Sequence, residues 1–247
     1  GLTVLIDGGS SDVSEAGNYR LIPFLKYMGI GHLDYVLISH GDADHYSAVA
    51  ELMENGEIGI GKLVVSWKYI EEREDKSGIG ALIALAEARG IPVAGAGEGS
   101  MIAGGSLSIE CIYPREGWSG SSENNCSVIW RASGRGIRIL FTGDMEEEEE
   151  KALMADYRGR EEALRADILK AAHHGSRTSG GEDFLEAVNP RAAVISCGQD
   201  NSYGHPHEET LNRLEDIGCR TFITARMGAI SVEGRGGHVV IRPLLPH

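Results

Sequence analysis

Short apolar runs along this chain end repeatedly in a glycine, an aspartate or a histidine. Residues 2–6 form such a run before Asp7, and residues 35–38 form another before Ser39 and His40. Runs of this length, bounded by turn residues, are typical of buried strands. Active sites of α/β proteins gather at the carboxyl ends of strands. The pattern therefore favours an α/β fold that collects polar side chains at its strand ends.

Segments with helical spacing of apolar residues alternate with these runs. The expected strands cover residues 2–7, 35–39, 63–66, 107–113, 127–131, 137–141, 167–170, 192–196, 221–224, 229–232 and 239–242. The expected helices cover residues 18–28, 45–55, 79–89, 183–188 and 208–217, and another helix opens at 146–151. Because strands follow one another in the middle and at the end, two mixed sheets fit better than one doubly wound sheet. The glycine-rich stretch 95–105 is expected to be the loosest segment.

Length and hydropathy favour one globular domain. A chain of 247 residues often folds as a single α/β domain. The mean hydropathy is −0.16, and without an apolar run of about 18 residues we expect no membrane span. The chain shows no signal-peptide pattern and starts at Gly1 instead of Met. We therefore expect residues 1–247 to be one domain of a longer protein.

The acidic charge balance restricts the possible partners. The chain has 37 Asp and Glu residues against 23 Lys and Arg residues, which gives a net charge of −14. Clustered basic side chains normally supply affinity for phosphate, so this composition argues against a broad basic face for nucleic acid. Bound cations can dominate a local field, however, so a phosphate held through metal ions stays possible.

Two further groups of residues do not need a metal-site interpretation. The four cysteines form no CxxC pair, and we expect reduced core residues at Cys111, Cys126, Cys197 and Cys219. The five consecutive glutamates at 146–150 are expected to form a solvated helix face that favours the helix N-terminus.

The segment 39–46 carries the strongest signal for chemistry. Four potential metal ligands lie within six residues, directly after a predicted strand: His40, Asp42, Asp44 and His45. In an extended loop, residues 40, 42 and 44 project to one side, whereas His45 begins a helix and turns toward the other side. Such a loop can serve two neighbouring cations, as two-metal hydrolysis requires. The alternative is a polar loop in which Asp44 caps the next helix.

Three later apolar runs end in the same way. The run 137–141 leads to Asp144, the run 168–170 leads to His173 and His174, and the run 194–197 leads to His205. Each signal is weak alone, because an aspartate after glycine is often a turn residue and a histidine pair is often structural. Together they predict that these side chains converge with the loop 39–45 on one cleft. Asp7 is expected to orient that loop and not to bind metal.

The order of the motifs LIDGG, SHGDADH, FTGD and HHGS resembles the metallo-β-lactamase fold superfamily over nearly the whole chain. The finer resemblance is to the C-terminal domain of ComEC-type DNA-uptake (competence) proteins. It rests on HHGS, on Glu123-Asn124-Asn125 before a serine and a strand, and on Tyr203-Gly204-His205-Pro206. The resemblance implies an αββα sandwich of two mixed sheets flanked by helices, with the metal site at one edge.

The resemblance also implies an activity and a location. It implies a metal-dependent nuclease that degrades single-stranded DNA, the strand not taken into the cell, during natural transformation. The chain would then be a soluble domain of a bacterial inner-membrane protein on the extracytoplasmic side. Its partners would be single-stranded DNA and the membrane-channel portion of the same protein.

Carried over to this sequence, the resemblance assigns a role to each candidate residue. The implied metal ligands are His40, Asp42, Asp44, His45, Asp144, His173 and His174. Asp144 would bridge two ions, and His173, nearer to its strand end, is favoured over His174 for the second site. The implied catalytic residues are Asp44, Asp144 and His205. The implied substrate-binding residues are Asn124, Asn125, Ser176 and His205.

Two departures from the superfamily pattern concern the first metal site. Asp42 stands where the commoner loop has a histidine, and Asn124 or Asn125 stands where another first-site histidine is expected. Carboxylate and amide oxygens suit manganese or magnesium, whereas imidazole favours zinc. We therefore expect two divalent ions, Mn²⁺ or Zn²⁺, with a weaker first site, and no small organic cofactor.

Two other functions compete with the nuclease. The first is hydrolysis of another substrate, such as a phosphorylcholine ester, a lactone, a thioester or a β-lactam. Asp42 and the asparagine pair argue against the lactam and thioester reactions, because those enzymes use histidines there. The second is a catalytically silent DNA-binding module of the uptake channel, which the intact set of candidate ligands disfavours.

Overall fold

The computed structural model describes residues 1–71, 78–235 and 238–245, and it divides into two compact units, Gly1–Gly97 and Glu98–His247. Among the described residues, no helix is long and apolar enough to cross a membrane. The expectation of one domain over residues 1–247 stays a prediction.

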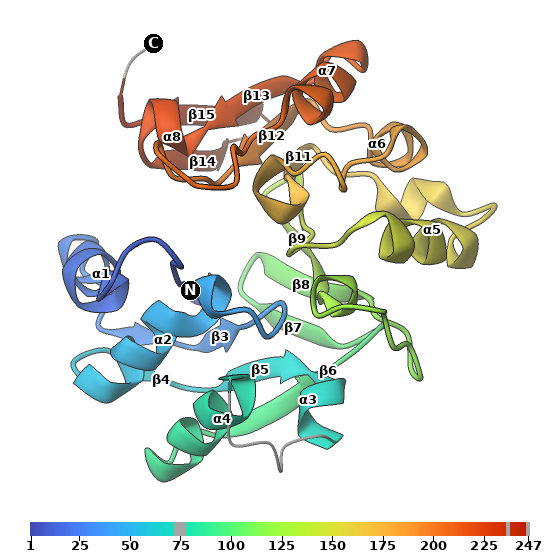
Figure 1. Cartoon of the computed structure of the whole chain (residues 1–247). Coiled ribbons are helices and arrows are strands. Elements are labelled where there is room, and N and C mark those ends of the chain that lie inside the picture. Colours follow the sequence, from blue (N-terminus) through green and yellow to red (C-terminus); the bar gives the residue numbers. More distant parts are fainter. Residues whose placement is uncertain (72–77, 236–237, 246–247) are drawn as a thin grey trace. The chain divides into compact units, whose positions relative to one another are not determined.

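The first unit is a parallel sheet covered by helices (Figure 1). Its four strands lie in the order β1-β3-β5-β6 and pair in parallel throughout: β1 Val4–Ile6, β3 Tyr35–Leu37, β5 Leu63–Ser66 and β6 Val93–Ala96. The helical segments are η1 Gly17–Leu21, a π-helix, followed by α1 Ile22–Tyr27, α2 Ala43–Asn55, α3 Trp67–Glu71 and α4 Gly78–Ala88. A short parallel pair joins β2 His32–Leu33 to β4 Gly59–Ile60.

One face of this sheet carries the core of the unit. Val36 and Val65 are fully buried and pack with Leu52 of α2 and Leu82 of α4. The mixed arrangement predicted for both sheets is therefore wrong for this one. Helices α2 and α4 connect successive strands, and such crossovers produce parallel neighbours.

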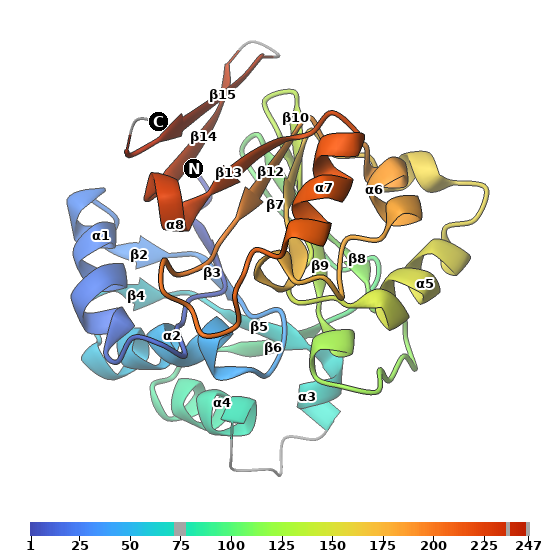
Figure 2. The same ribbon diagram turned by 45° about the horizontal axis from the view of Figure 1, so that its top comes forward.

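The second unit contains a seven-stranded mixed sheet (Figure 2). The strand order is β13-β12-β11-β10-β9-β8-β7, antiparallel from β7 to β10 and parallel from β10 to β13. The strands are β7 Met101–Gly104, β8 Leu107–Tyr113, β9 Ile129–Gly134, β10 Ile137–Phe141, β11 Ile168–Lys170, β12 Ala192–Ile195 and β13 Arg220–Ile223. A hairpin of β14 Ile230–Arg235 and β15 His238–Pro243 follows.

Three helices cover one face of this sheet: α5 Glu147–Asp156, α6 Glu182–Val188 and α7 Glu208–Asp216. Leu140 and Ala193 of the sheet pack against Leu153, Phe184 and Leu214 of these helices. Shorter turns are η2 Asn124–Cys126, η3 Glu161–Leu164 and η4 Ala172–Gly175, and α8 Thr224–Met227 follows β13. On the other face, Ala192 and Phe222 pack with Ile230 and Ile241 of the hairpin.

The glycine-rich stretch 95–105 is more ordered than the sequence predicts, because β6 and β7 include much of it. A Cβ atom at Gly95 would lie 3.0 Å from Cα of Trp67, so α3 packs directly over the glycine. Small residues here allow a close helix–sheet contact instead of a loose loop. The four cysteines are free thiols, as predicted, and three of them are buried.

The solvated face predicted for the glutamate run is wrong for two of its members. Glu149 is fully buried and Glu150 is 4% exposed. Glu150 accepts hydrogen bonds from the backbone N–H groups of Gly180 and Gly181, at 2.5 and 2.9 Å. Burial raises the pKa of Glu149, and the charges of Glu148 and Glu150 add to this, although a backbone N–H at Ser127 opposes it. Burial of Glu149 therefore favours its protonated, neutral form.

We predict that Glu149→Gln makes stability less dependent on pH. The folded-state pKa lies above the ordinary value of 4.5, so the unfolded state loses its proton first as pH rises. Stability is then full below about pH 4.5 and falls above it by about 1.4 kcal/mol per pH unit until the folded carboxyl also ionises. Urea unfolding between pH 5 and 8 measures this slope. The exposed Glu147→Gln is the control, and an equal slope in both variants would contradict the prediction.

Candidate metal centre

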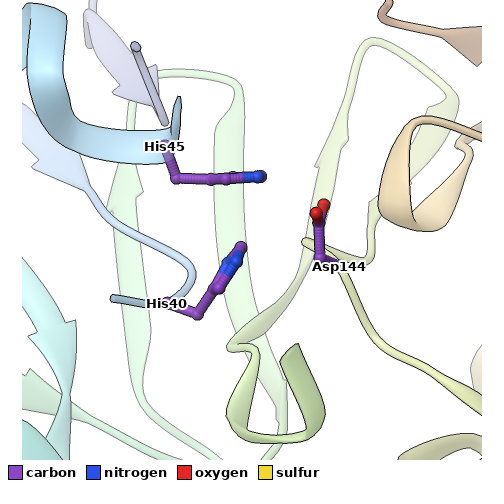
Figure 3. Close-up of side chains that lie close together, drawn as sticks. All are labelled: His40, His45 and Asp144. Carbon is purple, nitrogen blue, oxygen red and sulfur yellow. The ribbon is translucent and has the colours of Figure 1, made fainter. Parts of the chain in front are cut away.

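The first group of candidate ligands lies in the loop between β3 and α2, where the rings of His40 and His45 lie side by side (Figure 3). Their centroids are 4.1 Å apart, and both side chains are buried, at 0% and 3% exposure. Two buried imidazoles at this distance need fixed orientations, because a free choice of tautomer would leave polar atoms without partners.

Asp7 provides that orientation from the end of β1. Its carboxylate accepts hydrogen bonds from the backbone N–H of Ser39 at 2.7 Å, from the Ser39 hydroxyl at 2.8 Å and from Nδ1 of His45 at 2.9 Å. Burial raises the pKa of Asp7, but His45 and these hydrogen bonds outweigh it, so the net pKa is lowered. An ionised Asp7 accepts a hydrogen bond from Nδ1–H of His45. This fixes the tautomer of the ring in which Nε2 carries the lone pair.

Ser39 extends the same arrangement to His40. Because the Ser39 hydroxyl donates to Asp7, its oxygen can accept from Nδ1 of His40, 3.0 Å away. Nε2 of His40 is buried and makes no hydrogen bond to the described residues, and it lies 3.6 Å from Oδ2 of Asp42. A buried nitrogen in this state fits a metal ligand.

The two glycines after Asp7 explain the LIDGG motif. Gly8 accepts from the backbone N–H of Val49 and donates to the carbonyl of His45, at 3.1 and 2.7 Å. A Cβ atom at Gly9 would lie 2.6 Å from the backbone of Asp44. The chain after β1 therefore lies directly against the first turn of α2, which only a residue without a side chain allows.

The structure revises the predicted loop in one respect. Helix α2 begins at Ala43, with Asp42 as its N-cap residue in extended conformation, so Asp44 lies inside the first turn and does not cap the helix. The Asp42 side chain is half-exposed and makes no capping hydrogen bond. Asp42 is thus the most accessible carboxylate of the loop. The extended conformation predicted for residues 40–44 therefore ends at Asp42. A negative charge such as that of Asp44 is favourable in the first turn of a helix, which is consistent with the helix starting two residues earlier.

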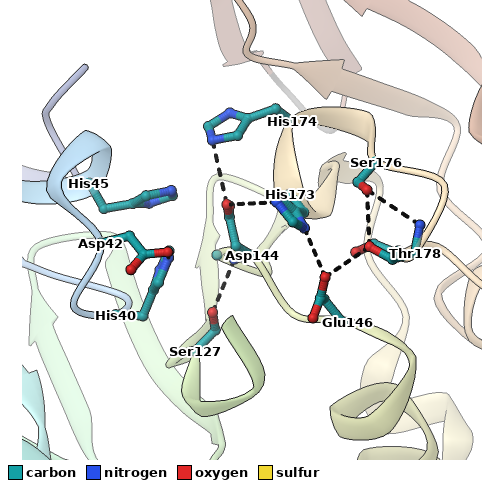
Figure 4. A network of polar contacts seen from close by, with 12 residues as sticks. His40, Asp42, His45, Ser127, Asp144, Glu146, His173, His174, Ser176 and Thr178 are labelled. Carbon is teal, nitrogen blue, oxygen red and sulfur yellow. Dashed lines mark hydrogen bonds and ion pairs between the residues drawn. The ribbon is translucent and has the colours of Figure 1, made fainter. Parts of the chain in front are cut away.

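The second group lies at the carboxyl ends of β10, β11 and β12 (Figure 4). Asp144 follows β10, is 3% exposed, and its backbone N–H donates to the Ser127 hydroxyl at 3.0 Å. Its Oδ2 lies 3.5 Å from Nε2 of His174 and 3.9 Å from Nε2 of His173. These three side chains are therefore brought together, as the sequence predicted for this half of the set.

His173 and His174 have backbone φ angles of 46° and 53°. Two successive non-glycine residues in the left-handed region are a strained arrangement of the kind found at functional sites. With this backbone conformation the two rings lie at an interplanar angle of 68°, with their centroids 6.4 Å apart. Each ring thereby reaches a different partner through Nδ1.

Nδ1 of His174 donates to the backbone carbonyl of Ser196 at 2.7 Å, which fixes the tautomer with a lone pair on Nε2. Nδ1 of His173 lies 3.2 Å from the Glu146 carboxylate, a contact that has the distance of a hydrogen bond but not its angle. Glu146 also accepts from the Thr178 hydroxyl at 2.9 Å. The geometry therefore favours His174 over His173 as a metal ligand, the reverse of the sequence-based preference.

The predicted substrate-binding residues have different surroundings. The Ser176 hydroxyl is buried and bonds to the Thr178 hydroxyl at 2.9 Å. The buried Asn125 amide bonds to Ser122 and Glu148, and its oxygen accepts from the Glu149 backbone N–H. Both side chains thus form hydrogen bonds within the unit. The structure assigns no hydrogen bond to the Asn124 side chain among the described residues.

His205 lies beside the histidine pair. Its ring centroid is 5.5 Å from that of His173 and 6.1 Å from that of His174. Burial, together with the neighbouring histidines, lowers the pKa of His205 to about 4. The ring is therefore neutral at pH 7 and can donate one hydrogen bond.

Comparison with known proteins identifies the family. Residues 1–110 match the family model described as the metallo-beta-lactamase superfamily. The chain is 31% identical over 214 residues to "ComE operon protein 3" of Bacillus subtilis. This alignment covers 87% of this chain and 26% of that protein. It is 30% identical over 235 residues to "Competence protein ComA" of Neisseria gonorrhoeae, covering 95% of this chain and 30% of that protein. The chain carries a metallo-β-lactamase domain related to the ComEC-type competence proteins.

A solved structure supports the fold alone. The metallo-beta-lactamase fold protein YhfI from Bacillus subtilis matches with a TM-score of 0.54 at 13% identity, covering 96% of this chain and 86% of that one. The predicted fold class is therefore confirmed. The chain spans between a quarter and a third of the length of the two competence relatives.

The donor groups that each unit presents suit divalent metal ions. Three histidines direct Nε2 away from an anchored Nδ1, namely His40, His45 and His174. The first unit adds Asp42 and Asp44, and the second unit adds Asp144. Imidazole nitrogens and carboxylate oxygens together suit zinc or manganese.

Four further residues contact the candidate ligands and were missed by the sequence analysis: Ser39, Ser127, Glu146 and Ser196. Ser196 acts through its backbone carbonyl, which leaves no signal in a side chain. Glu146 was concealed in a run of identical residues. Ser39 could have been noticed because it directly precedes His40 at a strand end.

We predict that Asp7→Asn weakens metal binding about 10- to 100-fold without unfolding the domain, the usual cost of losing a residue that orients a ligand. The asparagine amide can still accept a hydrogen bond from the Ser39 backbone N–H. It lacks the negative charge with which Asp7 orients the His45 ring. Calorimetric titration with Mn²⁺ and Zn²⁺ measures the affinity, and circular dichroism checks the fold. The exposed Asp12→Asn is the control; equal affinities in the two variants would contradict the positioning role of Asp7.

Proposed function

We propose that this domain is a metal-dependent phosphodiesterase that degrades single-stranded DNA during DNA uptake. The observation that supports it most is the anchoring of three histidines through Nδ1, by Asp7, Ser39 and the Ser196 carbonyl. Such anchoring is the usual second layer of a metal site. The similarity to a relative that is named a competence protein supports a role in DNA uptake.

In the proposed enzyme the candidate ligands of the domain serve to bind two divalent ions. His40, Asp42, Asp44 and His45 come from the first unit, and Asp144 with His174 from the second. When bound, such ions polarise a phosphodiester and activate water for attack at phosphorus. Ser127 fixes the backbone of Asp144, and Asp7 fixes the ring of His45, so the ligands need little rearrangement.

Charge explains how an acidic chain would accept DNA. The carboxylates of Asp42, Asp44 and Asp144 supply three negative charges, and two divalent ions supply four positive ones. The loaded site would then carry about one positive charge and attract a phosphodiester despite the net charge of −14. We also propose that the domain belongs to a membrane protein and acts on its extracytoplasmic side, beside the channel portion of that protein.

We predict that Asp144→Asn abolishes hydrolysis while the fold is kept. The neutral amide lacks the charge that the proposed bridge between two cations needs. Metal-stripped protein is incubated with end-labelled single-stranded DNA, and Mn²⁺, Zn²⁺ or Mg²⁺ is added back separately. The exposed Asp183→Asn is the matched control. Full activity and unchanged metal stoichiometry in Asp144→Asn would refute the two-metal proposal. If the unmutated protein hydrolysed other esters but did not cleave DNA, the alternative substrates would be favoured.

We further predict that Asp42→His shifts the metal preference toward zinc. The unmutated first site should bind a cation loosely and support activity best with millimolar Mn²⁺, because an exposed carboxylate favours a hard ion. An imidazole at this position should tighten zinc binding. Calorimetry of both proteins, with a parallel DNA assay, measures the shift. Tight zinc at both sites of the unmutated protein, with zinc-supported activity equal to manganese, would contradict this prediction.

A further inference from the structure

Tyr203 is one of the few large aromatic side chains that the described part of the second unit leaves exposed, at 61%. Other aromatic candidates for base stacking are packed: Tyr69 is 5% exposed, and the Trp118 ring packs edge-on against Tyr113 and donates Nε1–H to the Asn125 carbonyl. An exposed tyrosine of this size needs no explanation by itself. Its surroundings, however, distinguish it from an ordinary surface residue.

The Tyr203 ring continues a series of rings that begins beside Asp144. It stacks on His205 with a centroid distance of 5.6 Å and an interplanar angle of 17°. His205 in turn stacks on His174 at 6.1 Å and 24°. Nε2 of His174 lies 3.5 Å from the Asp144 carboxylate. Three near-parallel rings therefore lead from the second ligand group to the surface of the same unit.

The turn that carries Tyr203 is held in place by Asn201. Its amide donates to the carbonyls of Gly198 and His205, both at 2.8 Å, and its oxygen accepts from the His205 backbone N–H at 2.8 Å. Gly204 has a φ of 74° and supplies the left-handed residue that this turn needs. The ring is thus presented on a preorganised turn, which lowers the entropic cost of binding a ligand.

We propose that Tyr203 is a stacking platform for a base of single-stranded DNA next to the phosphodiester that is cleaved. One face of its ring is covered by His205, and the side chain is otherwise largely exposed, so an unpaired base can stack on it. Aromatic platforms bind single strands with little sequence preference, because every base offers a π-face. They also give affinity that does not depend on basic residues, which suits an acidic chain.

The proposal rests on the proposed function and adds a selectivity to it. A base must leave its helical stack before it can lie on the Tyr203 ring, so the platform favours a single strand over a duplex. The gain belongs to substrate binding and not to the bond-breaking step. Loss of the ring should therefore raise KM and leave kcat nearly unchanged.

The test compares Tyr203→Ala and Tyr203→Phe with Tyr27→Ala, an exposed tyrosine of α1 at 87% exposure, as the control. Binding of single-stranded oligonucleotides that contain 2-aminopurine and cleavage-resistant phosphorothioate linkages is followed by fluorescence quenching with the metal-loaded protein. Cleavage of unmodified strands and of abasic strands is followed with the same protein. We expect Tyr203→Ala to weaken binding about 5- to 150-fold and to remove the quenching, with Tyr203→Phe near the unmutated protein. Abasic strands should be cleaved equally by all variants.

The outcomes separate this proposal from the one on which it rests. Equal binding, quenching and KM in Tyr203→Ala and the unmutated protein would overturn the platform while leaving the nuclease intact. If Tyr203→Ala reduced cleavage of abasic strands as much as that of intact strands, the proposal would also be overturned. The tyrosine would then stabilise the structure of the site and not bind a base. If the unmutated protein neither binds nor cleaves single-stranded DNA, the proposed function itself fails.

Discussion

Control of imidazole orientation through Nδ1 is the interaction on which the candidate centre depends. A histidine ring has two nitrogens, and it can serve as a ligand only where a partner fixes the hydrogen on one of them. A carboxylate does this for His45, a hydroxyl for His40 and a backbone carbonyl for His174. Three chemically different partners achieve the same result. The requirement is therefore one of geometry and tautomer, which many residues can meet.

The same requirement explains why the ligands and their supports come from strand ends. Asp7 and Ser39 follow two neighbouring parallel strands, so their side chains meet at one edge of the first sheet. Asp144, the histidine pair and Ser196 follow three neighbouring strands of the second sheet. Parallel pairing brings residues far apart in sequence to one edge of the sheet, so the groups needed for a site can lie in the short segments that follow the strands.

Much of the fold could be predicted from the sequence, because apolar runs bounded by turn residues define buried strands. The strands β5, β8 and β10 begin and end where their runs do. The parallel first sheet, α3 and the ordered glycine stretch could not be predicted, because they depend on tertiary contacts such as that of Gly95 with Trp67. For the site, the sequence predicts which residue types serve as candidate ligands, because histidines and aspartates follow the apolar runs. The left-handed backbone of His173 and His174, which separates their partners, could not be predicted.

The contact of Gly9 with the first turn of α2 has a consequence for how this domain can be altered. Because the segment after β1 lies against that turn and also carries Asp7, the motif 39–45 does not contain all that its geometry requires. Transplanting this heptapeptide into another scaffold would move the ligands but not the strand that orients them. A domain trimmed by a few residues at its first strand would lose its ligand geometry although every ligand was still present. The ligand geometry of this unit thus depends on two distant segments, residues 7–9 and residues 39–45.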